Sequence, residues 1–219
     1  MEGVDANAGT RERLLEAAGE VFAEVGFRAA TVRDICALAG ANVAAVNYHF
    51  REKEGLYAEA LRHAHCQVAA GYVQQFSALD AAPPEARLTA YVSSFMLSLF
   101  DDRRPAWHAK LLAREMIEPT RTLDELVENG IRPRYAMLQE IVRELLGPAS
   151  ADADLVKYCA ASVMGQCLLY RHCKPVVERL EPTHPYDQEG TLRRASHIAR
   201  FSIAAMRRLA GEASGGAAP

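Results

Sequence analysis

The sequence predicts an all-α protein, in which an N-terminal three-helix helix-turn-helix domain is followed by a larger helical domain. Apolar residues recur at helical spacing in successive segments, and Gly or Pro residues stand between these segments. No segment has the alternating pattern of a strand, and no long repeat occurs. We expect an unstructured N-terminus at 1–9, the small domain at 10–55, the large domain at 56–210 and a flexible tail at 211–219.

The first predicted helix begins at Thr10. Apolar residues from Leu14 to Val25 keep helical spacing, and Gly26 then provides a stop signal because glycine adopts the left-handed cap without steric cost. This helix is expected to support the two shorter helices that follow it.

The stretch 31–53 predicts two short helices separated by a tight turn. Thr31, followed three residues later by Asp34, is similar to the capping box that opens a helix. Gly40 stands where the first short helix would end, and Asn42 can cap the second. A helix, a glycine turn and a second helix are typical of a helix-turn-helix motif.

In the second short helix, Val43, Val46 and Phe50 are expected to share one face. The opposite face combines small residues with Asn, Tyr and His, which is unusual for a surface that meets only water. Asn can bond the edge of adenine, and Tyr and Lys suit phosphate oxygens, so DNA binding is favoured over a solvated αα-hairpin, which remains the alternative. The predicted DNA-binding residues are Thr31, Arg33, Asn42, Val43, Ala44, Ala45, Asn47, Tyr48, His49 and Lys53.

Three pieces of this region carry a family pattern: RERLLEAAGEVFAEVGF, the turn T-x-R-D-I-C-x-x-A-G, and VNYHFREKEGLY. Through them, residues 11–57 resemble the DNA-binding domain of the TetR family of repressors. Asn47 replaces the family's usual aromatic residue and Ala44 its usual Gly or Ser, so no target sequence is carried over. The resemblance implies a homodimeric repressor that binds a palindromic double-stranded DNA operator and is released by a small-molecule effector.

The charge of the chain argues against a non-specific coat for nucleic acid. The formal net charge is −3, and residues 1–63 carry seven Lys/Arg against ten Asp/Glu, which again gives −3. No apolar run reaches the length of a membrane span, and the first 30 residues lack a signal core. We therefore expect a cytoplasmic protein that does not interact with a membrane.

The cysteines and histidines do not predict a metal site or a cofactor. The five cysteines include no C-x-x-C pair. His63, His65 and Cys66 lie close together in sequence, but residues two apart do not share a helix face.

Long helices are predicted for the rest of the chain, after the Asp80-Ala-Ala-Pro-Pro break. The predicted ranges are 52–79 before the break and 84–101, 104–117, 120–146, 152–173 and 187–210 after it. Pro133 is expected to split or kink the 120–146 helix near Gly130.

Two of these helices, 152–173 and 187–210, carry more apolar surface than a single core requires. One interpretation is ordinary core packing. The other is a four-helix seam between two protomers, which also suits DNA binding because one short helix contacts few base pairs. The predicted dimer-interface residues are Val156, Ala160, Val163, Cys167, Ile198, Phe201 and Met206.

The middle of the chain carries the sequence REMIEPT at 114–120, with Gly165-Gln166 and Tyr170-Arg171 later. These pieces resemble the C-terminal domain of the CecR (CerR) group within the TetR family, whose effectors vary. Aromatic and Met residues in this region are typical of an apolar pocket with a few polar groups, although they also suit an ordinary core. The predicted effector-binding residues are Phe95, Trp107, His108, Arg114, Glu115, Gln166, Tyr170 and Arg171.

No enzyme motif occurs in the chain, which has no G-x-S-x-G, Walker loop, H-E-x-x-H or G-x-G-x-x-G. We therefore predict a regulator rather than an enzyme. The alternative is an all-α adaptor that uses its apolar seams to bind a protein partner without a small-molecule ligand.

Overall fold

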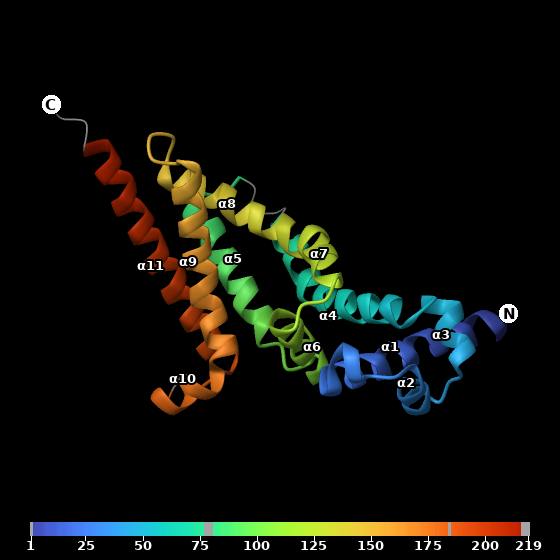
Figure 1. The fold of residues 1–219 in the computed structure, drawn as a ribbon. Helices are drawn as coiled ribbons and strands as arrows, with labels where there is room; N and C mark the ends of the chain where they lie inside the picture. Colours follow the sequence, from blue (N-terminus) through green and yellow to red (C-terminus); the bar gives the residue numbers. More distant parts are fainter. Residues whose placement is uncertain (1, 77–80, 184, 216–219) are drawn as a thin grey trace. The chain divides into compact units, whose positions relative to one another are not determined.

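The computed structural model describes residues 2–76, 81–183 and 185–215, and the side chains within 9–65, 81–183 and 185–212 (Figure 1). As predicted, these residues form helices and no strand. The chain divides into two compact units. Unit 1 comprises Met1–Gln67 and Asp102–Gly130, and unit 2 comprises Val68–Asp101 and Ile131–Pro219. Unit 1 therefore includes a segment from the middle of the chain.

Unit 1 begins with α1 (Glu2–Ala29), so the prediction that this helix starts at Thr10 was wrong. The predicted stop at Gly26 is a kink inside α1, where the backbone adopts φ 80° and ψ 167°. The helices that follow are α2 (Val32–Ala39), α3 (Val43–Phe50) and α4 (Lys53–Phe76), which belongs to unit 1 as far as Gln67. The inserted segment adds α6 (Ala106–Ile117) and α7 (Thr122–Leu126) to this unit.

The caps of α2 and α3 form as the sequence predicts. The Thr31 side chain accepts a hydrogen bond from the Asp34 N–H at 3.2 Å and donates one to the Asp34 carboxylate at 2.6 Å. Gly40 adopts the left-handed conformation, with φ 60° and ψ 40°. The Asn42 side-chain oxygen accepts from the Ala45 N–H at 2.9 Å. Local sequence signals therefore determine where both short helices begin and where α2 ends.

A γ-turn joins α3 to α4. The Glu52 N–H donates to the Phe50 carbonyl at 2.9 Å, and Arg51 between them has φ 68° and ψ −54°. This is a strained conformation for a residue that carries a side chain. Gly55 makes the turn possible, because a Cβ at that position would lie 2.2 Å from the Phe50 carbonyl oxygen.

Unit 2 contains α5 (Pro84–Leu99), α8 (Arg132–Leu146), α9 (Ala153–His172), α10 (Lys174–Leu180) and α11 (Gln188–Gly215). As predicted, the 120–146 region is interrupted before Pro133, by the π-helical turn η1 (Val127–Ile131) between α7 and α8. The helix α10 was not predicted, and the last helix is longer than predicted, since α11 continues to Gly215. Residues 216–219 of the predicted tail lie outside the described part of the chain.

The core of unit 2 is formed where α5, α8, α9 and α11 pack against one another. Its central cluster consists of apolar side chains, including Leu88, Met96, Leu138, Val163 and Ile198. Among the described residues, no helix is long and apolar enough to cross a membrane.

Candidate nucleic-acid interface

The helix α3 presents an exposed face above a buried one. Val46 and Phe50 are buried, and so are Ile35, Cys36 and Ala39 of the neighbouring α2. Tyr48 on the opposite side of α3 is 75% exposed, and no side-chain hydrogen bond is described for it. The motif thus has a packed interior and an outer surface that is available to a partner.

The predicted DNA-binding residues largely occupy this outer surface. Val43, which was expected to share a face of the helix with Val46 and Phe50, is 44% exposed. The exposed members of the predicted set are Thr31, Arg33, Asn42, Val43, Ala44, Asn47 and Tyr48, and the half-buried ones are Ala45, His49 and Lys53.

Three members of this set also hold the motif together. Thr31 and Asn42 cap α2 and α3, so the Asn42 oxygen is already engaged and only its amide N–H groups are free to donate. The Lys53 ammonium donates to the Ala30 carbonyl at 2.8 Å and lies 4.6 Å from the centre of the Phe27 ring. A loss of DNA binding on replacement of Lys53 would therefore not by itself identify a phosphate contact.

Polar contacts from α1 position the two short helices. The Arg13 guanidinium donates to the Ala39 carbonyl at 3.2 Å, next to the turn between α2 and α3. Arg11 forms a 2.6 Å ion pair with Glu59 of α4, and its guanidinium lies 5.4 Å from the centre of the Phe50 ring. These contacts connect both ends of the helix-turn-helix to the rest of unit 1.

The helix α6 packs directly on α1. The Trp107 indole N–H donates to a Glu16 carboxylate oxygen at 2.9 Å. A Cβ on Gly19 would lie 2.4 Å from the Trp107 ring, so only glycine permits this approach. Lys110 pairs with Glu24, which lowers the pKa of that carboxyl group, mainly through the hydrogen bond from Lys110. The segment 102–130 is therefore part of the structure that supports α1 and the two short helices packed on it.

A buried carboxylate lies where α4 meets this inserted segment. Glu115 has no exposed surface and accepts hydrogen bonds from the Tyr57 hydroxyl at 2.6 Å and from the Thr120 N–H and hydroxyl at 2.9 Å. Burial, followed by the hydrogen bond to Glu115, raises the pKa of Tyr57 far above its usual value. The phenol stays neutral and donates at ordinary pH.

The structure assigns the predicted effector-binding residues to different units. Trp107, His108, Arg114 and Glu115 belong to unit 1, and Phe95, Gln166, Tyr170 and Arg171 belong to unit 2.

Arg114 and Glu115 form internal bonds rather than facing an open pocket. The Arg114 guanidinium donates to the Glu24 carbonyl at 3.0 Å, beside the Gly26 kink, and lies 3.6 Å from the Glu118 carboxylate. These contacts give Arg114 a structural role within unit 1.

In unit 2, the Gln166 amide donates to the Ser162 carbonyl at 3.2 Å and to the Ser202 hydroxyl at 3.3 Å. The Tyr170 ring packs under Arg194, whose guanidinium carbon is 5.4 Å from the ring centre. These two side chains therefore have internal partners, as Arg114 does in unit 1.

Most of the predicted dimer-interface residues lie inside the chain's own core. Phe201 is 59% exposed, but the other six are buried, so they are not available to a second protomer: Val156, Ala160, Val163, Cys167, Ile198 and Met206. The apolar faces of α9 and α11 lie where the sequence predicted them, but they pack against helices of the same chain. The outer face of α9 carries Tyr158, Leu169 and the small residues Ala161, Ser162 and Gly165, all exposed.

Two family models match the chain. Residues 14–60 match the bacterial regulatory proteins of the tetR family, and residues 84–206 match the C-terminal domain of the HTH-type transcriptional dual regulator CecR. The second match includes α6, which packs in unit 1 with the helices of the first match.

Among curated relatives, the HTH-type transcriptional dual regulator CecR of Shigella flexneri is 27% identical over 83% of this chain and 84% of its own length. The HTH-type transcriptional repressor KstR2 of Rhodococcus jostii is 46% identical, over only 25% of this chain and 27% of its own. The match to KstR2 is therefore local.

Solved structures support the same fold. HlyIIR, a hemolysin II transcriptional regulator, has a TM-score of 0.61 at 20% identity, covering 89% of this chain and 97% of that one. A transcriptional regulator from Rhodococcus sp. Rha1 has a TM-score of 0.57 at 22% identity, covering 87% and 96%. The families are regulators rather than enzymes. With its helix-turn-helix, its inserted α6 and both family matches, the chain belongs to the TetR family of bacterial transcriptional regulators, with a C-terminal domain of the CecR type.

Proposed function

We propose that this regulator is a homodimeric repressor that binds a palindromic DNA operator through α3 and is released by a small-molecule effector. The observation that carries the DNA-binding part is the exposed face of α3, with Tyr48 projecting from a motif whose other side is buried and capped. A helix that is fixed on one side and unpaired on the other is suited to entering the major groove.

The capping bonds refine the roles of individual residues on this face. Tyr48, with its free hydroxyl, and Arg33 are assigned to phosphates. Ala44 and Asn47 are assigned to base edges, because they are exposed on α3 and Asn47 has no capping role. The Asn42 side-chain oxygen is held by the capping bond, so we assign its amide N–H groups to an acceptor on the DNA rather than the whole side chain to a two-point contact with adenine.

The proposed dimer uses the outer faces of α9 and α11. Ala161, Ser162 and Gly165 allow a second helix to approach closely, and a Cβ on Gly165 would meet no atom within 4 Å of the same chain. Tyr158 and Phe201 add exposed aromatic surface. Two protomers are needed because two recognition helices must match half-sites roughly 34 Å apart.

Repression is proposed from the resemblance to the TetR family of repressors. Among the relatives, KstR2 is described as a repressor and CecR as a dual regulator. We place effector binding in unit 2, around Phe95, Gln166, Tyr170 and Arg171.

The DNA-binding proposal is tested by selecting bound fragments from genomic DNA and measuring affinity for the selected duplex against salt concentration. Tyr48→Phe and Arg33→Ala should weaken binding on all duplexes, and Arg33→Ala should reduce the salt slope by about one unit. Asn47→Ala should instead change sequence preference. Arg193→Ala, at an exposed position on α11, is the control for charge alone. Unchanged operator affinity in all three variants would contradict the assignment of α3.

The dimer is tested by sedimentation of the full chain at micromolar concentration. Gly165→Leu and Phe201→Glu should shift the protein toward monomers and weaken operator binding, while Val176→Glu, on the exposed side of α10, should change neither. A wild-type protein that sediments as a monomer would refute the homodimer.

A further inference from the structure

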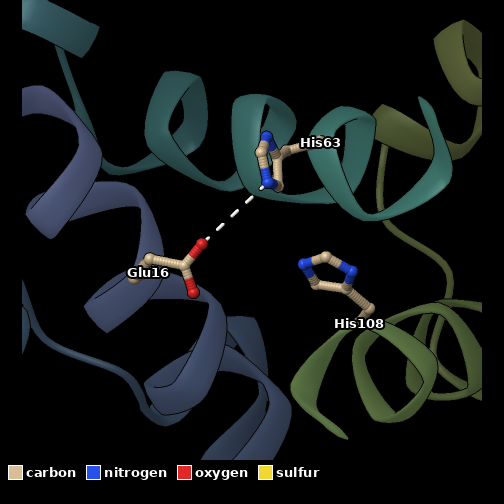
Figure 2. Close-up of side chains that lie close together, drawn as sticks. All are labelled: Glu16, His63 and His108. Carbon is tan, nitrogen blue, oxygen red and sulfur yellow. Dashed lines mark ion pairs between the residues drawn. The ribbon is translucent and has the colours of Figure 1, made fainter. Parts of the chain in front are cut away.

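Three side chains from distant parts of the sequence converge in unit 1. Glu16 comes from α1, His63 from α4 and His108 from α6, and they point toward a common space in Figure 2. The His63 Nε2 lies 3.9 Å from a Glu16 carboxylate oxygen. One candidate ligand atom from each residue lies within 4.8 Å of the other two.

His108 is the unusual member of this cluster. It is only 4% exposed, and neither Nδ1 nor Nε2 has a hydrogen-bond partner among the described residues. Burying a polar group without a partner is unfavourable, and histidine nitrogens in folded proteins are normally bonded. The position of His108 therefore indicates a partner that binds a neutral imidazole nitrogen.

We propose that Glu16, His63 and His108 bind a divalent transition-metal ion of the zinc type. Two imidazoles and one carboxylate form a ligand set that suits zinc and its neighbours in the first transition row, whereas calcium and magnesium prefer oxygen ligands alone. Three protein ligands leave a fourth position for water or another donor.

The surrounding contacts fit this assignment. The Trp107 indole N–H donates to Glu16 Oε2, which leaves Oε1 directed toward His63, so a second contact orients the carboxylate as in known metal sites. Burial, and to a smaller extent the nearby His63, lowers the pKa of His108.

The geometry requires a modest contraction. Ligand atoms at about 2.0–2.1 Å from a tetrahedral zinc ion lie roughly 3.3 Å apart, compared with the 3.9 Å between His63 and Glu16. The side chains of His63 and Glu16 are 32% and 41% exposed, so both can rotate inward and an ion can enter from their side. His108 provides the fixed point of the site.

Metal at this position would link α6, which belongs to the CecR-type domain by sequence, to α1 and α4 of the DNA-binding unit. No metal site was predicted from the sequence, because His63 was compared only with its sequence neighbours His65 and Cys66. The three proposed ligands come from three different helices, so they are too far apart in the sequence to form a recognisable metal-binding motif.

The test is titration of the full chain with Zn²⁺ against a chromophoric chelator, and with Co²⁺ while following the emission of Trp107. The ring of Trp107 is 4.1 Å from that of His108, centre to centre, so a paramagnetic ion in the site should quench its fluorescence. We expect one Zn²⁺ per chain, saturable quenching by Co²⁺, and a higher melting temperature with metal.

His63→Gln and Glu16→Gln should each weaken Zn²⁺ binding at least tenfold and abolish the quenching. Both positions are partly exposed, so these variants should keep the helical circular dichroism spectrum of the wild type, which His108 variants need not do. His172→Gln, at an exposed position on α9, is the matched control and should bind Zn²⁺ as the wild type does. A wild-type chain that binds no Zn²⁺, or binds it equally well without His63 and Glu16, would overturn the proposal.

Discussion

In unit 1 a buried carboxylate, Glu115, is surrounded by hydrogen-bond donors, whereas the centre of unit 2 is a cluster of apolar side chains around Leu138 and Val163. Apolar packing tolerates small shifts, because its energy depends on buried area and volume rather than on direction. A hydrogen-bonded network specifies one arrangement, since a buried donor that loses its partner is costly. The arrangement of α4 and α6 around Glu115 is therefore more narrowly specified than the packing in the core of unit 2.

The largest effect should come from breaking the network in unit 1. Glu115→Ala leaves the Tyr57 hydroxyl and the Thr120 N–H unpaired, and hydrogen bonds to charged groups contribute about 1.5–3 kcal/mol each. We expect unit 1 to lose at least about 3 kcal/mol of stability, measured by urea unfolding through the emission of Trp107, the only tryptophan. Glu118→Ala, which removes an exposed carboxylate from the end of the same helix, should change little. Equal losses in the two variants would contradict the role of the network.

A substitution of Gly by Ala should change stability in opposite directions at two positions, one in each unit. Gly19→Ala would place a Cβ 2.4 Å from the Trp107 ring, and such overpacking costs about 1–3 kcal/mol. Gly211→Ala in α11 meets no atom within 4 Å and should stabilise its helix by about 0.5–1 kcal/mol. Thermal unfolding of both variants checks the signs. A stabilised Gly19→Ala variant would mean that α6 does not pack on α1 as described.

Alkaline pH should weaken unit 1 through Tyr57. Its pKa is raised by burial and by Glu115, so the folded state holds the phenolic proton more tightly than the unfolded state does. The contribution of Tyr57 to the free energy of unfolding is therefore fully present below about pH 10, the pKa of tyrosine in the unfolded chain. Above that pH the contribution is lost, by up to about 1.4 kcal/mol per pH unit.

Tyr57→Phe isolates this contribution. Above pH 10, the free energy of unfolding of this variant, measured through Trp107 emission, should decrease less steeply with pH than that of the wild type. Tyr91→Phe in unit 2, where burial also raises the tyrosine pKa, should leave that dependence on Trp107 emission unchanged. A Tyr57→Phe variant with the alkaline slope of the wild type would contradict the assignment.

A comparably small effect is expected at the γ-turn after α3. Arg51→Gly should stabilise unit 1 by about 1 kcal/mol, because glycine adopts positive φ without strain. The same change removes an exposed cation beside α3, so operator affinity should fall while stability rises. Melting temperature and operator binding, measured on one preparation, would separate the two effects. Arg28→Gly, at an exposed site before the motif, tests whether loss of any nearby charge suffices.

Local signals predicted much of unit 1. Thr31, Gly40 and Asn42 each determine a helix end through contacts within a few residues, and such contacts can be read directly from sequence. The break before Pro133 was predicted for the same reason. The helix at 174–180 was missed because it follows α9 with only Cys173 between them, and no spacing of apolar residues marked it as a separate element.

Contacts between distant segments were not predictable in the same way. Apolar periodicity identified the buried faces of α9 and α11, but it could not tell a partner helix in the same chain from one in a second protomer. Two side-chain groups could likewise be identified only once the fold was known, because their members lie dozens of residues apart in the sequence. They are the cluster of Glu16, His63 and His108 and the hydrogen-bond network of Glu115. Val43 was placed on the face of Val46 and Phe50 from spacing alone and is exposed at the first turn of α3.

The central claim is that α6 belongs to the DNA-binding unit, although its sequence matches the CecR-type C-terminal domain. Amide hydrogen exchange of the full chain tests it, with Gly19→Ala perturbing unit 1 and Leu138→Ala perturbing the core of unit 2. In the Gly19→Ala variant, the amides of residues 106–117 should lose protection from exchange together with those of α1. In the Leu138→Ala variant they should keep it. The opposite pattern, with α6 following α5 and α8, would contradict the claim.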